Sequence, residues 1–460
     1  MKDNPILRTD SYKMSHPWQL PLGTTNLFSY LESRGGRYGS TLFFGLQYLL
    51  KEYLTTPITK ADVEEAATFC EAHGEPFAKD GWMRIVEKHN GFLPLRIKAV
   101  PEGTVVPVSN VLLTVESTDS EIPWVASWVE TQIVRGIWYP TTVATLSYYC
   151  KKVILEALKE SSDDPMGELP FKLHDFGARG VSSHESAGIG GMAHLVNFMG
   201  SDTIEGIRFA NHYYNHPMAA FSIPATEHST ITSWGKENEV DAYRNVIQQF
   251  AKPGKIVACV SDSYDIFNAV ENLWCDDLHQ EVKNSEATLV IRPDSGNPAE
   301  VNVKLLQIME RKIGTPKNMK GYKVLPKYFR LIQGDGNKNE DSIREVLHAL
   351  LSNGYSASNI AFGMGGGLLQ QVDRDTQRFA YKCSAATVNG QEIKVFKDPI
   401  TDKGKRSKAG RLDLVFREHQ FQTVEGQQRD SVLVPVFENG KILKEYTLDE
   451  VRKTSEKSLR

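Results

Sequence analysis

Four short apolar runs between Lys255 and Gly367 decide the fold, because each ends in a cluster of glycine, aspartate or serine. The runs are KIVACVSDSYD (255–265), TLVIRPDSGNP (288–298), YFRLIQGDG (328–336) and NIAFGMGGG (359–367). Apolar runs without polar alternation are typical of strands that are buried on both faces. Helix-like segments such as 341–354 lie between them, and strands that alternate with helices predict a parallel sheet.

Two upstream runs extend the same pattern toward the N-terminus, namely FKLHDFGARG (171–180) and AFSIPATEHS (220–229). Polar residues gathered after strands are typical of the catalytic end of a (β/α) barrel. An open doubly wound sheet also binds its ligands at the carboxyl ends of its strands. The recurrence of at least six such strand ends favours the barrel.

The segments before and after this region do not show the same alternation of strands and helices. Residues 95–118 are rich in strand-forming residues, with turn signals at 101–103 and 109–110, and residues 124–138 are apolar enough for a buried helix. The barrel pattern stops after Cys383, and DSVLVPVFENGKI (430–442) is strand-like again. We therefore predict an α/β chain with a (β/α) barrel-like domain at 151–390 and an α+β accessory domain formed by residues 1–150 and 391–460.

Composition narrows the classes of protein. The net charge of -4 over 460 residues argues against a nucleic-acid partner. Five cysteines without a CxxC pair are typical of a protein whose thiols are reduced. The sequence contains no run of about 18 apolar residues, so no membrane span is predicted. We therefore expect a cytoplasmic protein with neither nucleic acid nor a membrane as partner.

Four familiar motifs are incomplete or absent. The DFG triplet at 175–177 has no accompanying kinase motifs. GMGGGLL has Leu368 where a dinucleotide-binding loop needs glycine, and no GxxxxGK[ST] loop occurs. His212 and His216 have helical spacing but lack the HExxH pattern of a zinc site.

Acidic residues follow three of the predicted strands, in SDSYD, RPDSG and QGDG. A single aspartate after a strand is often only a helix cap. Several converging carboxylates without cysteine suit Mg²⁺, which prefers oxygen ligands. Asp262 and Asp294 are the candidate metal ligands and, with Glu227 and His228, the candidate catalytic residues.

The glycine-rich loops GMGGG and QGDG predict a phosphate site, because backbone N–H groups can point at a phosphate there. Arg374 and Lys382 could add fixed positive charge. In TEHST (226–230), a neutral His228 could act as a nucleophile toward phosphorus, with Asp262 to orient it.

Taken together, these strings resemble the nicotinamide phosphoribosyltransferase family. The similarity runs from TDSYKMSH (9–16) to KGKRSKAGR (403–411) and includes KLHDFGARGVSS, PATEHSTITSWGK, IRPDSGNP and FKDPITDKGKRSK. It implies a type II phosphoribosyltransferase, with an α/β barrel and an accessory domain, that works as a homodimer with shared active sites.

The resemblance also implies an activity: nicotinamide and phosphoribosyl pyrophosphate give nicotinamide mononucleotide and pyrophosphate in NAD salvage, with Mg²⁺. ATP would be a co-substrate, hydrolysed through phospho-His228. The pyridine ring would stack between Phe176 and Tyr12, the latter contributed by the partner subunit. Asp202 would accept a hydrogen bond from the carboxamide, and Arg179 would face its oxygen.

The remaining matched positions would serve the phosphates, the ribose hydroxyls or the metal. They are Arg34, Arg292, Asp294, Gly334, Asp335, Gly365, Gly366, Arg374, Lys382, Lys397 and Lys405. The chain departs from some family members at Ala380, where they carry serine, so a hydroxyl contact to phosphate is missing.

Asp202 distinguishes between two related activities. A nicotinate carboxylate ~4 Å from this aspartate would be repelled by about 4 kcal/mol at an effective dielectric constant of ~20. The sequence thus favours the amide over nicotinate phosphoribosyltransferase activity. Two functions of other classes stay open at this point, a Mg²⁺-dependent barrel phosphohydrolase and a nucleotide-binding regulatory protein.

Overall fold

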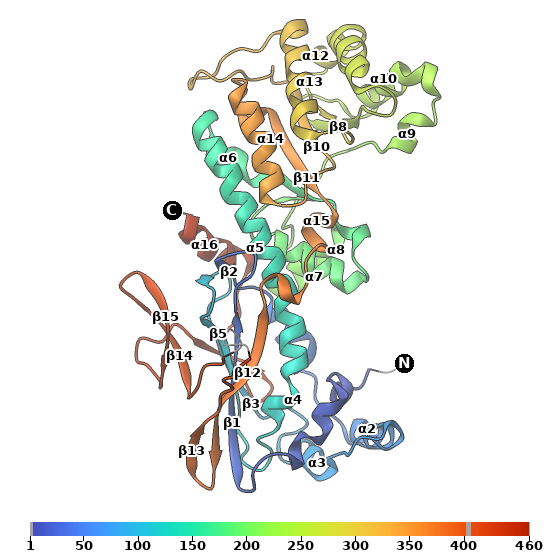
Figure 1. Cartoon of the computed structure of the whole chain (residues 1–460). Helices are drawn as coiled ribbons and strands as arrows, with labels where there is room; N and C mark the ends of the chain where they lie inside the picture. Colours follow the sequence, from blue (N-terminus) through green and yellow to red (C-terminus); the bar gives the residue numbers. More distant parts are fainter. Residues whose placement is uncertain (1–2, 402–405, 460) are drawn as a thin grey trace. The chain divides into compact units, whose positions relative to one another are not determined.

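The computed structural model describes residues 3–401 and 406–459, and the chain forms two compact units. The accessory unit comprises Met1–Thr145, Ala210–His216 and Asp373–Arg460, and the barrel unit comprises Leu146–Phe209 and Pro217–Val372 (Figure 1). Within the described residues, no helix is both long and apolar enough to cross a membrane.

Six parallel strands form the sheet of the barrel unit, in the order β7-β6-β11-β10-β9-β8. Their bounds are β6 Leu173–Asp175, β7 Gly200–Ser201, β8 Ile256–Val260, β9 Thr288–Arg292, β10 Phe329–Gln333 and β11 Ile360–Met364. Four consecutive residues of β8 are buried, as expected for a strand covered on both faces.

The extended segment 221–226 joins the two edges of this sheet. The Phe221 N–H donates to the Met199 carbonyl (2.8 Å) beside β7, and the Thr226 N–H donates to the Ala258 carbonyl (3.1 Å) of β8. Parallel bridges pair Phe221 with Gly200 and Ala225 with Ala258. This segment therefore bridges the two edges of the curled parallel sheet, and the predicted barrel-like fold is confirmed.

Helices follow the strands of the barrel unit (Figure 1). They are α6 Pro165–Glu168, α7 His184–His194, α8 Ile204–Tyr214, α9 His228–Thr232, α10 Glu239–Phe250, α11 Ile266–Asn268, α12 His279–Asn284, α13 Pro298–Ile313, α14 Glu340–Ser352 and α15 Gly366–Leu369. Local signals fix their starts: Asn297 caps α13 ahead of Pro298, and Asn339 forms a capping box with Ser342 in α14.

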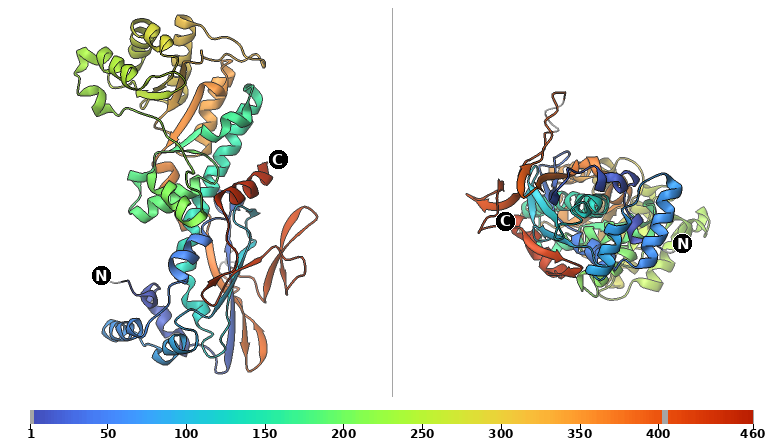
Figure 2. Two further views of the ribbon diagram at one scale, coloured as in Figure 1. Left: turned by 180° about the vertical axis from the view of Figure 1, so that it is seen from behind. Right: turned by 90° about the horizontal axis from the view of Figure 1, so that it is seen from below.

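The accessory unit is built on an antiparallel sheet in the order β13-β12-β1-β5-β3-β16-β17. Figure 2 shows the chain from two further sides. The bounds are β1 Thr24–Ser33, β3 Leu95–Ala99, β5 Val111–Ser117, β12 Phe379–Val388, β13 Gln391–Lys394, β16 Val434–Glu438 and β17 Lys441–Ile442. Small sheets pair β2 (Ser40–Leu42) with β4 (Val105–Pro107) and β14 (Leu412–Arg417) with β15 (Gln420–Glu425).

Helices α1 Leu46–Leu49, α2 Lys60–His73, α3 Lys79–Lys88, α4 Val125–Trp128 and α16 Leu448–Glu456 belong to the accessory unit, and α5 Glu130–Ser161 begins in it. The buried Glu102 ties the unit together. Its carboxylate accepts hydrogen bonds from the backbone N–H groups of Gly45 (3.0 Å) and Gln47 (2.7 Å) and from the Tyr214 hydroxyl (2.6 Å).

The Glu102 contact explains why the short segment Ala210–His216 leaves the barrel unit, which the sequence did not indicate. The chain returns to the accessory unit at Asp373, earlier than the expected residue 391, because β12 pairs with β1 along most of its length. The predicted strands at 95–118 form β3, β4 and β5, and the strand-like tail forms β16, which pairs with β3 as expected.

Candidate active site

The carboxyl ends of the barrel strands surround a cavity of about 890 Å³. The segments that follow β6, β7, β9, β10 and β11 line it, together with the segment that closes the barrel. The cavity brings together most of the predicted residues: Phe176, Arg179, Asp202, Glu227, His228, Arg292, Asp294, Gly334, Asp335, Gly365 and Gly366.

Asp262 follows β8 and holds His228 in place. One carboxylate oxygen lies 2.9 Å from His228 Nε2, and the other accepts hydrogen bonds from the Asp294 N–H (3.1 Å) and the Ser295 hydroxyl (2.5 Å). The Asp262 side chain is 4% exposed and that of His228 is 46% exposed. A buried carboxylate thus orients an accessible imidazole.

This contact assigns the tautomer of His228. An ionised carboxylate can only accept, so in the neutral imidazole Nε2 carries the hydrogen and Nδ1 keeps its lone pair. His228 is the first residue of α9, and Glu227 precedes it as the helix cap. Nδ1 is therefore the nucleophilic atom available to a phosphoryl group.

Arg292 and Asp294 contribute opposite charges to the cavity. Arg292 Nε is buried without a hydrogen-bond partner among the described residues and lies 3.8 Å from Asp294 Oδ1. Burial raises the pKa of Asp294, and the nearby Asp262 and Asp335 raise it further against the effects of Arg292 and His228. Both groups suit a ligand that carries phosphates and a cation.

Two positions at or beside this cavity require glycine because a neighbouring side chain approaches closely. A Cβ on Gly334 would lie 2.1 Å from Asp294 Oδ1, and a Cβ on Gly363 would lie 2.0 Å from the Phe176 ring. A Cβ on Gly365 would approach only the Phe176 carbonyl, at 3.4 Å. Gly365 therefore leaves open backbone toward the cavity, as a phosphate-binding loop needs.

Phe176 forms the wall between this cavity and a second cavity of about 590 Å³ inside the barrel; both are also lined by Asp202 and Arg292. The interior packs apolar side chains against Phe176, with Ala258, Val290 and Ile332 at its centre. The Phe176 N–H donates to the Met364 carbonyl at 3.0 Å, which fixes the residue at the junction. This junction suits a flat aromatic ligand.

Asp202 lies at the same junction and is held from two sides. Its backbone N–H donates to the Asp175 carbonyl (2.9 Å), and its Oδ1 accepts from the Ser222 hydroxyl (2.5 Å). The nearby carboxyl of Asp175 is buried, and burial raises the pKa of Asp175 to about 6. Asp202 itself is exposed.

The carboxylates do not form a complete metal site by themselves. Within residues 3–401 and 406–459, no group of three or more His, Cys, Asp or Glu side chains could hold a metal ion. Both oxygens of Asp262 already accept hydrogen bonds, whereas Asp294 and Asp335 line the cavity. The residues therefore fit a Mg²⁺ ion that takes its other ligands from a substrate.

The other predicted residues lie in the accessory unit, around a separate cavity of about 780 Å³. Tyr12, Arg34, Arg374, Lys382 and Lys397 line it, and burial lowers the pKa of Lys382. Lys405 lies outside the described residues. Ala380 also lines this cavity, so the departure from the family pattern falls on a surface rich in cations.

Several residues that line these cavities or lie directly beside them were not predicted from the sequence. They are Asp175, Ser222, Ser295 and Lys338 in the barrel unit and Arg135, Trp138 and Arg378 in the accessory unit. Ser295 follows Asp294 directly, and Ser222 interrupts an apolar run, so both carried a signal. Arg378 carried none, because its place depends on the pairing of β12 with β1.

Comparison with solved structures identifies the class of fold. A nicotinate-nucleotide pyrophosphorylase from Pyrococcus furiosus matches all of this chain and 96% of its own, with a TM-score of 0.64 and 14% identity. Human nicotinic acid phosphoribosyltransferase matches 98% of this chain and 93% of its own, with a TM-score of 0.58 and 15% identity. The fold is that of these phosphoribosyltransferase-type proteins.

Sequence comparison identifies the family. Residues 171–440 match the nicotinate phosphoribosyltransferase (NAPRTase) family, and residues 4–97 match the N-terminal domain of nicotinamide phosphoribosyltransferase. A nicotinamide phosphoribosyltransferase of Xanthomonas campestris pv. campestris is 54% identical over 98% of this chain and 97% of its own length. One of Acinetobacter baylyi is 30% identical over 98% and 96%. The chain belongs to the NAPRTase family.

Proposed function

We propose that this enzyme transfers the phosphoribosyl group of phosphoribosyl pyrophosphate to nicotinamide, giving nicotinamide mononucleotide and pyrophosphate in NAD salvage. The observation that carries the proposal is the position of Asp202 beside Phe176, in the cavity that also contains Arg292 and Asp294. The name shared by its relatives from Xanthomonas and Acinetobacter supports the same reaction.

The site can bind the pyridine ring by stacking and its amide by a hydrogen bond. Phe176 offers a face at the barrel junction, and Asp202 accepts from the carboxamide NH₂. Stacking contributes roughly 0.5–1.5 kcal/mol beyond burial. With nicotinamide held here, its ring nitrogen attacks the anomeric carbon from the face opposite to pyrophosphate.

The phosphoribosyl part needs positive charge and open backbone. Arg292 and the loop at Gly365–Gly366 would bind the departing pyrophosphate, and Asp294 and Asp335 would bind the ribose hydroxyls or hold the metal. Bound Mg²⁺ would neutralise charge on the pyrophosphate. Catalysis then consists of positioning and of stabilising the leaving group, because the protein forms no covalent bond to the sugar.

His228 supports the proposed coupling to ATP. Its Nδ1 attacks the γ-phosphorus of ATP, the bond to the β-phosphate oxygen breaks, and ADP leaves. Asp262 holds the Nε2 proton and stabilises the positive charge on the ring. Hydrolysis of the phosphoimidazole returns the free histidine and phosphate, so the cycle balances.

A homodimer would complete each site, with Tyr12 and the cations of the accessory cavity supplied by the partner subunit. The accessory cavity supports this, since five of the expected ligand-binding residues line it and none of those five lines the barrel cavity. The five free cysteines suit the reducing cytoplasm that we propose as its location.

The products test the proposal directly. We expect mass spectrometry to detect nicotinamide mononucleotide from nicotinamide, phosphoribosyl pyrophosphate and Mg²⁺, and ATP to increase its yield. Nicotinate mononucleotide formed at an equal or higher rate from nicotinate would instead favour the nicotinate enzyme. Release of phosphate without any nucleotide product would favour a phosphohydrolase.

Variants at Asp202 test the basis of amide selection. Asp202→Ala and Asp202→Asn remove the charge that repels nicotinate, so we expect the preference for nicotinamide, measured as the ratio of kcat/KM values, to fall up to about a thousandfold. If both variants keep the wild-type ratio, charge repulsion at Asp202 does not select the amide.

A further inference from the structure

Ser222 lies on the segment that closes the barrel, directly beside the carboxylate of Asp202. Its hydroxyl is 2.5 Å from Asp202 Oδ1, and both residues line the interior cavity next to Phe176. Among the described residues, Ser222 is the one side chain that donates a hydrogen bond to this carboxylate. The contact joins the closing segment to the end of β7.

An exposed carboxylate needs such a contact to select a ligand. Asp202 is exposed and follows a strand of only two residues, so its side chain alone would sample several rotamers. A donor on Oδ1 fixes the rotamer and leaves Oδ2 for a ligand. Because the hydroxyl is neutral, it orients the carboxylate without cancelling its charge, whereas an arginine or lysine partner would cancel it.

We infer that Ser222 is a specificity-determining residue that positions Asp202, so that the second carboxylate oxygen meets the carboxamide NH₂ of nicotinamide and repels the carboxylate of nicotinate. This inference rests on the proposed function. Ser222 acts through Asp202 and is a positioning residue, not a catalytic one.

The expected effect follows from the strength of the contact. A hydrogen bond to a charged group contributes about 1.5–3 kcal/mol, and about 1.4 kcal/mol corresponds to a tenfold change. Ser222→Ala should therefore raise the KM for nicotinamide at least about tenfold and lower the nicotinamide-to-nicotinate ratio of kcat/KM by a similar factor. The KM for phosphoribosyl pyrophosphate should stay unchanged, since Ser222 does not line the cavity at the strand ends.

The matched variants separate positioning from packing. Ser222→Thr keeps the hydroxyl and should retain the wild-type ratio, whereas Ser222→Cys keeps the size but donates weakly and should behave like Ser222→Ala. Ser352→Ala, which removes an exposed hydroxyl at the end of α14, should change neither KM nor the ratio. Thermal unfolding of each variant shows whether it is folded.

A double-mutant cycle provides the decisive measurement. In the Asp202→Ala background, Ser222→Ala should change the ratio less than twofold, because the residue that it positions is gone. Equal effects of Ser222→Ala in both backgrounds would overturn the inference and leave the proposed function intact. A wild-type enzyme that forms no nicotinamide mononucleotide would overturn both.

Discussion

The two ends of the barrel differ in how completely their charged side chains are hydrogen-bonded. At the amino end, Lys172 is buried. Its ammonium group contacts Glu168 (2.9 Å) and donates to the carbonyls of Ala357, Ser358 and Ile360 at 3.1–3.2 Å. At the carboxyl end, Arg292 Nε has no hydrogen-bond partner within the described part of the chain, and in the neutral imidazole His228 Nδ1 keeps a lone pair.

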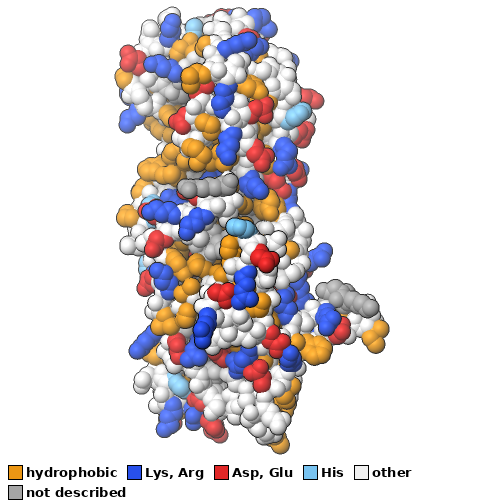
Figure 3. Space-filling view, turned by 90° about the vertical axis from the view of Figure 1, so that its left-hand side faces the viewer, with side chains coloured by type: hydrophobic (Ala, Val, Ile, Leu, Met, Phe, Trp, Pro, Cys, Tyr) orange, Lys and Arg blue, Asp and Glu red, His pale blue; other side chains and the backbone are white. Residues whose placement is uncertain are grey.

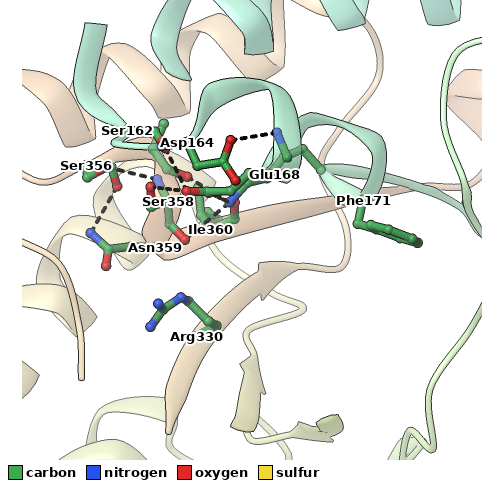
Figure 4. A network of polar contacts seen from close by, with 12 residues as sticks. Ser162, Asp164, Glu168, Phe171, Arg330, Ser356, Ser358, Asn359 and Ile360 are labelled. Carbon is green, nitrogen blue, oxygen red and sulfur yellow. Dashed lines mark hydrogen bonds and ion pairs between the residues drawn. The ribbon is translucent and has the colours of Figure 1, made fainter. Parts of the chain in front are cut away.

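Figure 4 shows the amino end of the barrel, where the hydroxyls of Ser162 and Ser358 donate hydrogen bonds to Glu168. Arg330 of β10 lies away from this group. Arg330 instead donates to backbone carbonyls, such as that of Phe329 at 2.6 Å. Groups that are fully paired add to stability, and groups left unpaired are available to a ligand. We therefore infer that the charged groups of the amino end stabilise the fold and that those of the carboxyl end bind the ligand, as in other parallel barrels.

The largest effect on activity is expected from a substitution of His228, at the carboxyl end of the barrel. His228→Ala should abolish ATP hydrolysis and the gain in product yield from ATP, while slow basal transfer and thermal stability persist. Acid-labile labelling from γ-³²P-ATP measures the phosphohistidine. His212→Ala, an exposed histidine of the accessory unit that lines neither active-site cavity, is the control and should label normally.

Label that persists in His228→Ala would place the phosphoryl group on another residue. Loss of basal transfer together with ATP hydrolysis would instead show that the imidazole serves the transfer step itself. Either result would break the separation of roles within the carboxyl end.

The sequence predicted which residues gather at the carboxyl end better than it predicted the packing of either unit. Asp262, Arg292 and Asp294 lie at the ends of apolar runs, and the parallel strands bring such positions together. Lys172 was not singled out, because its burial depends on carbonyls nearly two hundred residues away in the chain. The same holds for Tyr214, which joins the accessory unit through a long-range contact with Glu102.

The distribution of charge over the surface could not be predicted from the sequence, which gives only the net charge. On the face shown in Figure 3, the described basic and acidic side chains are interspersed and not gathered by sign. Four arginines lie together in the accessory cavity, where Arg135 and Arg378 join the predicted Arg34 and Arg374. Only the fold shows that these four residues share one surface.

An effect on stability is expected at the amino end. Lys172→Met should lower the free energy of unfolding by about 3–5 kcal/mol, because it leaves the carboxylate of Glu168 without its cation. Denaturant unfolding measures the change. The double variant Lys172→Met with Glu168→Gln should recover part of it, since no unpaired charge remains. A loss below about 1 kcal/mol would contradict the assignment of folding to this end.

The smallest effect concerns Asp175, the buried acid at the active end. Its folded pKa of about 6 lies above the ordinary value of 3.8, chiefly because burial disfavours the ionised form, and the nearby Asp202 and Glu205 add to this. The folded protein therefore holds this proton more tightly than the unfolded chain. The free energy of unfolding should fall as pH rises from about 4 to about 6, by up to ~3 kcal/mol for a shift of about two units.

Asp175→Asn removes this titration but keeps an oxygen for the Gly177 N–H, which lies 2.7 Å from the carboxylate. We expect the variant to match the wild type near pH 4 and to exceed its stability by up to ~3 kcal/mol at pH 7. The KM for nicotinamide should rise if the carboxylate also supports the turn that carries Phe176. A stability difference that does not change with pH would show that burial does not destabilise the ionised Asp175. The active end would then carry no stability cost at this residue, and the contrast between the two ends would rest on Arg292 and His228 alone.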